Sequence, residues 1–135
     1  MNLPSPKIYF ISDSEAYLLE DYTIDTIIGK ITIKRAFIFD GASIPKLFWT
    51  LLGEQPFSGK IIPAAICHDI LFRTHFVSCL KANDVWNDLC VRNKVAIGKR
   101  VIMTQTLNAF GWIAYNKNKP KDIEYYKQFL IVEAK

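Results

Sequence analysis

The segment from Pro63 to Phe72 places an imidazole and a carboxylate, His68 and Asp69, in the middle of an otherwise apolar helix. A carboxylate removed from water without a partner is destabilised by several kcal/mol, so Asp69 needs a cation, a metal ion or several donors nearby. Successive helix residues point about 100° apart. His68 and Asp69 therefore cannot serve one atom in the same way, but one can orient a group that the other binds.

The following helix supplies a second carboxylate, Asp84, at the border of its apolar stripe. The connection around residues 75–78 is short, so the two helices are expected to lie antiparallel and can bring Asp84 within reach of His68. Asp84 would then fix the imidazole tautomer, while the other ring nitrogen takes a proton from water or a hydroxyl. His68 and Asp84 are the catalytic candidates.

The same residues are compatible with two further roles. Asp69 and Asp84, together with His68, could bind a divalent ion such as calcium or zinc, with Asp69 as the candidate ligand. Alternatively His68 bonds a backbone carbonyl or Asp84 for purely structural reasons. Asp84 lies in the first turn of its helix, where the macrodipole alone favours a carboxylate.

A second polar segment, Phe39 to Pro45, reads F-D-G-A-S-I-P. It is typical of a strand that ends in an Asp-Gly turn, with Ser43 capping the next helix. Structure alone can explain it. The functional alternative is that Asp40 and Ser43, at the edge of the sheet, face the His68 helix and complete its site.

The secondary structure around these residues follows the order strands, then helices. Residues 7–40 are rich in β-branched and aromatic residues interrupted by turn chemistry, including Asp13-Ser14 and Ile28-Gly29-Lys30. Periodicity then predicts helices at about residues 44–52, 61–75, 80–94 and 98–116. The predicted class is α+β, a small antiparallel N-terminal sheet followed by a bundle of about four helices.

The predicted organisation is one domain over residues 1–135, with a strand-rich part (7–40), a helical part (44–116) and a C-terminal tail (120–135). The tail has apolar residues at helical spacing and is expected to form a short helix. The apolar run from Leu107 to Tyr115 is too short for a membrane span, which needs about 20 residues.

Composition narrows the class of protein. Half of the 135 residues are hydrophobic and 13% are aromatic, which excludes a disordered chain. The N-terminus lacks a secretory signal, so a cytoplasmic location is expected, in the host cell if a phage encodes the chain. Three cysteines without a C-x-x-C spacing are expected to be small buried hydrophobes.

The formal net charge of +4 arises in the second half, which holds eleven basic and six acidic residues against six and seven in residues 1–60. This excess is compatible with contact to phosphates or an anionic surface, and a solvated helix end explains it equally well. Basic residues are not interleaved with aromatic ones as in a nucleic-acid groove, so nucleic acid is not an expected partner.

Four segments form a specific pattern: F-D-G-A-S-I-P, then A-x-x-x-H-D-x-L-[YF], an alanine-aspartate pair before an aromatic residue, and F-G-W. Here they are residues 39–45, 64–72, 84–86 and 110–112. With this pattern the chain resembles an uncharacterised family of tailed phages and bacteria, the domain of unknown function numbered 1353. Asn83 replaces the pattern's alanine, and Phe72 its usual tyrosine. The resemblance implies a phage or prophage origin and no established activity.

The pairing of H-D-x-x-[YF] on one helix with an aspartate on the next also resembles the secreted and parvoviral phospholipases of the A-two type. That resemblance implies that His68 is the general base, Asp84 its orienting partner and Asp69 a calcium ligand. The chain departs from it because no glycine-rich calcium loop comes shortly before His68.

Three functions follow as hypotheses. The leading one is a small phage-type accessory protein that acts as a metal-assisted or His-Asp hydrolase on an ester, phosphoester or amide. The second is a non-catalytic phage protein that binds a host or virion partner, with His68, Asp69 and Asp84 as a buried network that pins two helices. The third is a binder of a small anionic ligand in counter-defence, using Lys99, Arg100 or Arg73.

Thermal unfolding of the wild type and His68→Ala, each with EDTA or with added calcium or zinc, separates these hypotheses. A metal site predicts a metal-dependent rise in melting temperature that His68→Ala abolishes. A structural network predicts a loss of about 1–3 kcal/mol that is independent of metal, because buried polar partners are left unsatisfied.

Overall fold

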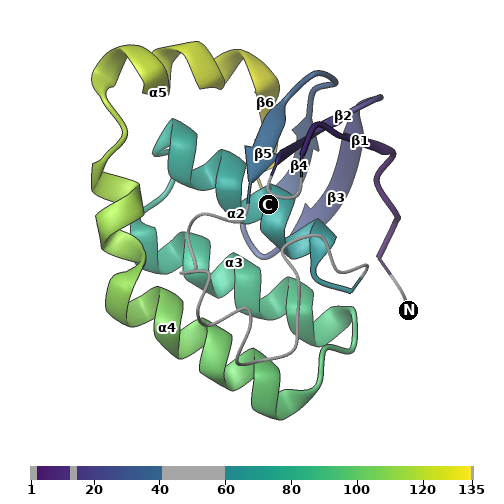
Figure 1. Cartoon of the computed structure of the whole chain (residues 1–135), viewed down its shortest axis with the longest axis vertical. Helices are drawn as coiled ribbons and strands as arrows, with labels where there is room; N and C mark the ends of the chain where they lie inside the picture. Colours follow the sequence, from purple (N-terminus) through teal and green to yellow (C-terminus); the bar gives the residue numbers. More distant parts are fainter. Residues whose placement is uncertain (1–2, 13–14, 41–59, 135) are drawn as a thin grey trace.

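The structure is a computed structural model that describes residues 3–12, 15–40 and 60–134 (Figure 1). The strands in these ranges form two three-stranded antiparallel sheets. The first has the order β1-β2-β5, and the second β3-β4-β6. The strands are β1 (Ile8–Phe10), β2 (Glu15–Leu18), β3 (Tyr22–Thr26), β4 (Gly29–Ile33), β5 (Ile38–Asp40) and β6 (Leu130–Ala134).

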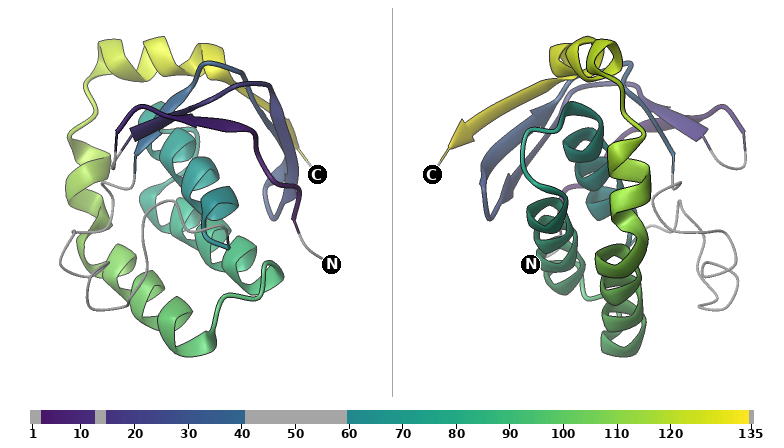
Figure 2. Two further views of the ribbon diagram at one scale, coloured as in Figure 1. Left: turned by 45° about the vertical axis from the view of Figure 1, so that its right-hand side comes forward. Right: turned by 90° about the vertical axis from the view of Figure 1, so that its left-hand side faces the viewer.

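Alternation of side chains explains why these segments are strands. In β3 and β4 every second residue is buried, which leaves one apolar face on each strand for the core. Figure 2 shows the strands as a curved layer over the helices. Strand β3 packs against α3 (Cys79–Arg92), whereas β4 and β5 pack against α2 (Ile62–Thr74), so the sheets cover the helix that carries His68.

Two further helices complete the four that belong to the described residues: α4 (Ile97–Asn116) and α5 (Pro120–Tyr126). Helix α2 is central, because it contacts the other three helices as well as β4 and β5. Each of its residues except Arg73 is buried, as expected for a helix that is apolar on all sides. Pro63 lies in its first turn, and His75 ends it in the left-handed conformation at φ 50°.

The α+β class predicted from the sequence is confirmed. The helices expected at residues 61–75, 80–94 and 98–116 are α2, α3 and α4, within one or two residues at each end. The helix expected at residues 44–52 and the turn at Asp13-Ser14 lie outside the described residues. Within the described ranges no helix is both long enough and apolar enough to cross a membrane.

The C-terminal tail differs from the expectation of one short helix. Helix α5 and a 3-10 turn (Lys127–Phe129) come first, and β6 then pairs antiparallel with β4, with Val132 opposite Ile31. Half-buried and exposed residues alternate along the first residues of β6, and the edge of β4 supplies the partner for its backbone. Such pairing between distant segments is not visible in local spacing.

A substitution at Gly29 tests whether β6 lies as close to β4 as the structure shows. Its φ is 128°, and a Cβ there would collide with the carbonyl oxygen of Glu133. We expect Gly29→Ala to lower the free energy of unfolding by about 1–3 kcal/mol in urea denaturation. Gly98→Ala is the control, because no heavy atom of the described residues lies within 4 Å of a Cβ at that position. Equal stability of Gly29→Ala and the wild type would contradict the pairing.

Candidate functional site

His68 lies inside the helical layer, with 2% of its surface exposed. Its ring packs between Phe72, one turn further along α2, and Trp86 of α3, at centroid distances of 4.0 and 5.7 Å. The ring atom Nε2 lies 2.8 Å from Oδ1 of Asn83. An amide oxygen accepts only, so Nε2 carries the proton and Nδ1 has the lone pair.

A second amide holds Asn83 in this orientation. Nδ2 of Asn83 donates to Oδ1 of Asn108 at 3.0 Å, so its Oδ1 is directed at the imidazole. Asn83 is completely buried, whereas Asn108 is exposed on α4. The chain His68–Asn83–Asn108 therefore connects α2, α3 and α4 and fixes one tautomer of the histidine.

Burial also determines the charge of the ring. Loss of solvation lowers the pKa of His68 from its ordinary 6.5 to about 4, and the hydrogen bond to Asn83 opposes this shift only partly. The imidazole is therefore neutral at physiological pH. A neutral ring with a lone pair on Nδ1 can accept a proton or bind a metal ion.

Asp69 has the cation that its burial requires. Nε of Arg73, one turn later in α2, lies 3.0 Å from its Oδ1. The Arg73 guanidinium also donates to the hydroxyl of Tyr126 at 2.6 Å and lies 4.7 Å from the centroid of that ring. This ion pair joins the centre of α2 to α5.

The expected contact between His68 and Asp84 is replaced by the contact with Asn83. Asp84 is exposed, because α3 turns Asn83 and Trp86 toward the interior and Asp84 away from it. It also lies beyond the first turn of α3, which begins at Cys79 and has no acidic residue in that turn, so its expected place in the first turn is wrong. His68, Asp69 and Asp84 therefore do not converge. Among residues 3–12, 15–40 and 60–134, no three His, Cys, Asp or Glu side chains are grouped closely enough to hold a metal ion.

The remaining candidates lie at or beyond the edge of the described structure. Asp40 is the last residue of β5, where its backbone pairs with Glu15, and β5 packs on α2. The strand that leads to the F-D-G-A-S-I-P segment therefore contacts the His68 helix. Ser43 lies outside the described residues.

Three polar side chains near His68 were missed in the sequence: Asn83, Trp86 and Asn108. Nε1 of Trp86, whose ring packs against His68, is buried and has no hydrogen-bond partner among the described residues. Such an orphan donor is costly, and it marks a position where the polar atom of a ligand or a water molecule is favoured. The available signal was the spacing of Asn83 and Trp86, three residues apart on the apolar stripe of α3.

The cysteine nearest to His68 in the sequence is not a nucleophile at neutral pH. Burial raises the pKa of the Cys67 thiol to about 12, and the same effect raises that of Cys90 to about 12. Both side chains are fully buried, as expected of small hydrophobes, whereas the third cysteine, Cys79, is only half-buried.

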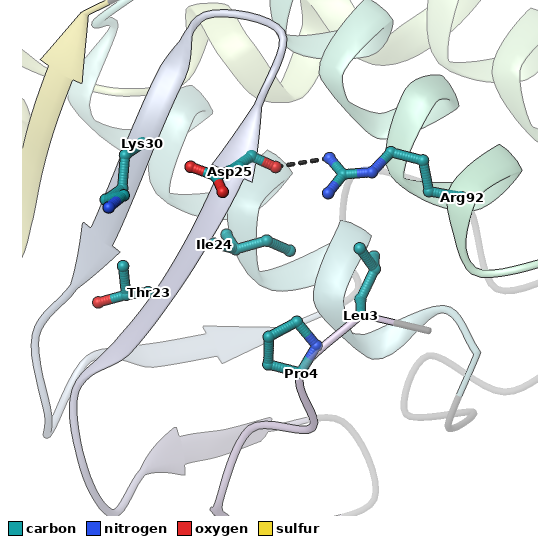
Figure 3. Close-up of a pocket in the computed structure, with 7 residues that line it drawn as sticks. All are labelled: Leu3, Pro4, Thr23, Ile24, Asp25, Lys30 and Arg92. Atoms are coloured by element: carbon teal, nitrogen blue, oxygen red, sulfur yellow. Dashed lines mark hydrogen bonds between the residues drawn. The ribbon is translucent and has the colours of Figure 1, made fainter. Parts of the chain in front are cut away.

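Two pockets lie away from His68. One, of about 570 Å³, lies between the β3–β4 hairpin and the end of α3, where Arg92 donates to the backbone carbonyl of Asp25 and Lys30 lies nearby (Figure 3). The other, of about 550 Å³, is lined mainly by apolar residues between α2, α5 and β6, together with His75 and Lys127. Both have the volume of small-molecule sites.

Comparison with known proteins identifies the family. The model of the family described as protein of unknown function (DUF1353) matches residues 16–106, more than half of the chain. The chain therefore belongs to the DUF1353 family. No curated protein and no solved structure is significantly similar to it.

The titration of His68 makes stability depend on pH. Its pKa is about 4 in the folded state and about 6.5 in the unfolded state, so the unfolded chain binds more protons between these values. The stabilisation is present above pH 6.5 and is lost as the pH falls toward 4, by roughly 3 kcal/mol at most. We expect urea denaturation at several pH values in this range to show that the free energy of unfolding falls more steeply with decreasing pH for the wild type than for His68→Gln. Equal slopes for the wild type and His68→Gln would contradict the buried neutral ring.

Proposed function

We propose that this chain is a hydrolase in which His68 is the general base. The proposal rests on one observation, the 2.8 Å hydrogen bond from Nε2 of a buried, neutral His68 to Asn83. This bond leaves Nδ1 as the proton acceptor and prevents the ring from rotating. An oriented base of this kind typically contributes a factor of about 10²–10⁴ to a rate.

In the proposed reaction, Nδ1 of His68 takes a proton from a water molecule while the water oxygen attacks the carbonyl carbon or the phosphorus of the substrate. The imidazolium then returns this proton to the leaving oxygen or nitrogen. The ester, phosphoester or amide is thereby cleaved with one water consumed. The orphan N–H of Trp86 would donate to the oxygen on which negative charge develops.

Asn83 takes the orienting role that the sequence suggested for Asp84. An amide sets the tautomer as a carboxylate does, but it adds no negative charge to stabilise the imidazolium. Asn83 can orient His68 only if its Oδ1 faces the imidazole ring. The hydrogen bond from Nδ2 of Asn83 to Asn108 favours that orientation. Asn83 stands where the family pattern has alanine, so this support of His68 is a property of the present chain.

A second candidate function is supported by the burial of the same residues. His68 and Asn83 are 2% and 0% exposed, and Asp69 is already paired with Arg73. On this alternative the network only holds α2, α3 and α4 together in a non-catalytic protein that binds a host or virion partner. The phage origin and the cytoplasmic location are part of both proposals and rest on the sequence.

The third hypothesis, a small anionic ligand, has less support. Arg73 is paired with Asp69, and Arg100 donates to the side-chain oxygen of Asn87 at 3.0 Å. Both guanidinium groups thus already have partners inside the protein.

Hydrolysis of p-nitrophenyl esters, phosphate esters and anilides tests the proposal. We expect His68→Gln to lower kcat about 100-fold or more, because a glutamine amide cannot take the proton from water. Asn83→Ala, which restores the residue of the family pattern, should cause a smaller loss. The rate should stay constant from pH 8 down to about pH 6 and fall as the pH approaches 4, where the ring becomes protonated.

Asp84→Asn distinguishes the two orienting partners. If Asn83 holds the ring, this exposed substitution leaves kcat unchanged. If Asp84→Asn instead lowers kcat as much as His68→Gln does, Asp84 is the residue that orients His68. Absence of activity toward every substrate class, together with a His68→Gln protein less stable by about 1–3 kcal/mol, would support the structural alternative.

A further inference from the structure

Helix α4 is apolar on two opposite sides, and the described residues cover only one of them. Its inner side packs against α3 and α2 through Met103, Thr106, Leu107 and Gly111. The outer side also consists largely of apolar residues, and these are exposed: Ile97 (71%), Val101 (39%), Ile102 (49%), Trp112 (54%) and Ile113 (42%). Figures 1 and 2 show α4 at the periphery of the molecule, beyond α3. A helix that is hydrophobic all round is normally buried all round, so the outer side indicates a partner.

The spacing of the outer residues is that of a helix–helix seam. Val101, Gln105, Asn108 and Trp112 follow one another at intervals of four, three and four. Alternating intervals of this kind keep one stripe of side chains in contact with a second helix over several turns. The 20 residues of α4 give a seam of about 30 Å.

This stripe is complementary to itself in one orientation. The centre of the stripe between Val101 and Trp112 is also the centre of α4, between residues 106 and 107. If a second copy runs antiparallel about a two-fold axis at that point, Val101 faces Trp112 of the second copy. Gln105 then faces Asn108 of the second copy, so apolar residues meet apolar residues and amides meet amides.

The hydrogen-bonding atoms and the charges agree with the antiparallel orientation. Oδ1 of Asn108 already accepts from Asn83, so its Nδ2 can donate to the Gln105 oxygen of the second copy. Helix α4 has no acidic residue and carries Lys99 and Arg100 near its N-terminus. A parallel pair would gather four cations at one end. An antiparallel pair separates them and puts each set near the negative end of the other helix dipole.

We propose that the outer face of α4 is a homodimer interface, in which two copies of this chain pair antiparallel about a two-fold axis between residues 106 and 107. The interface is isologous, since each residue pair occurs twice. Through Asn108 it also reaches the amide chain that orients His68, although the dimer does not depend on His68 being catalytic.

Sedimentation equilibrium of the full chain tests the dimer, and a charge pair tests its direction. We expect the wild type to be a dimer at tens of micromolar. Val101→Lys and Trp112→Glu should each weaken self-association by about tenfold or more, because each buries a charge twice. A mixture of the two variants should dimerise again, since the introduced lysine of one copy and the introduced glutamate of the other would then form an ion pair in the antiparallel arrangement.

Ile131→Lys is the matched control, because Ile131 is 49% exposed on β6, on the other side of the molecule from α4 (Figure 1). It should dimerise as the wild type does. If Trp112→Glu lowers the melting temperature, the reversed pair Val101→Glu and Trp112→Arg takes its place. A wild-type protein that is monomeric would overturn the proposal. The same holds if the monomer binds anionic vesicles through α4, because the outer face would then contact a membrane surface and not a second copy. A mixture that stays monomeric, or single variants that remain dimeric, would overturn it as well.

Discussion

Helix α2 is buried along its whole length, and the elements around it are arranged to satisfy its polar groups. Strands from both sheets and three helices contact it, and Arg73 is its one residue that is not buried. His68 and Asp69 therefore find hydrogen-bond or ion-pair partners inside the protein, which offsets the cost of their burial. His68 thus pairs with Asn83 of another helix, and Asp69 with Arg73 of the next turn.

The polar partners of α2 fix the positions of neighbouring helices more specifically than hydrophobic contacts alone would. Asp69 holds Arg73, which in turn contacts Tyr126 and ties the tail to the core. His68 holds Asn83 and, through it, Asn108. A buried polar network of this type specifies one arrangement of helices, since any shift leaves a donor or acceptor unpaired. The same rigidity is what a general base requires.

Helix α4 occupies a different position in this architecture. It covers α3 with one face, and Asn108 joins it to the network, yet its outer face exposes several large apolar residues. In the proposed dimer the second copy supplies the missing layer. The amides at the centre of the seam would then continue the hydrogen-bonded chain that starts at His68.

The α+β class, the approximate bounds of α2, α3 and α4, and the burial of His68 and Asp69 could all be predicted from the sequence. These features depend on local periodicity and on the apolar neighbours of each residue. The partner of His68, in contrast, depends on how the helices pack. Adjacent helix residues point about 100° apart, so the rotation of α3 about its own axis decides whether Asp84 or Asn83 faces His68. The pairing of β6 with β4 depends on packing in the same way, because contacts between residues about 100 positions apart leave no periodic signal in either segment.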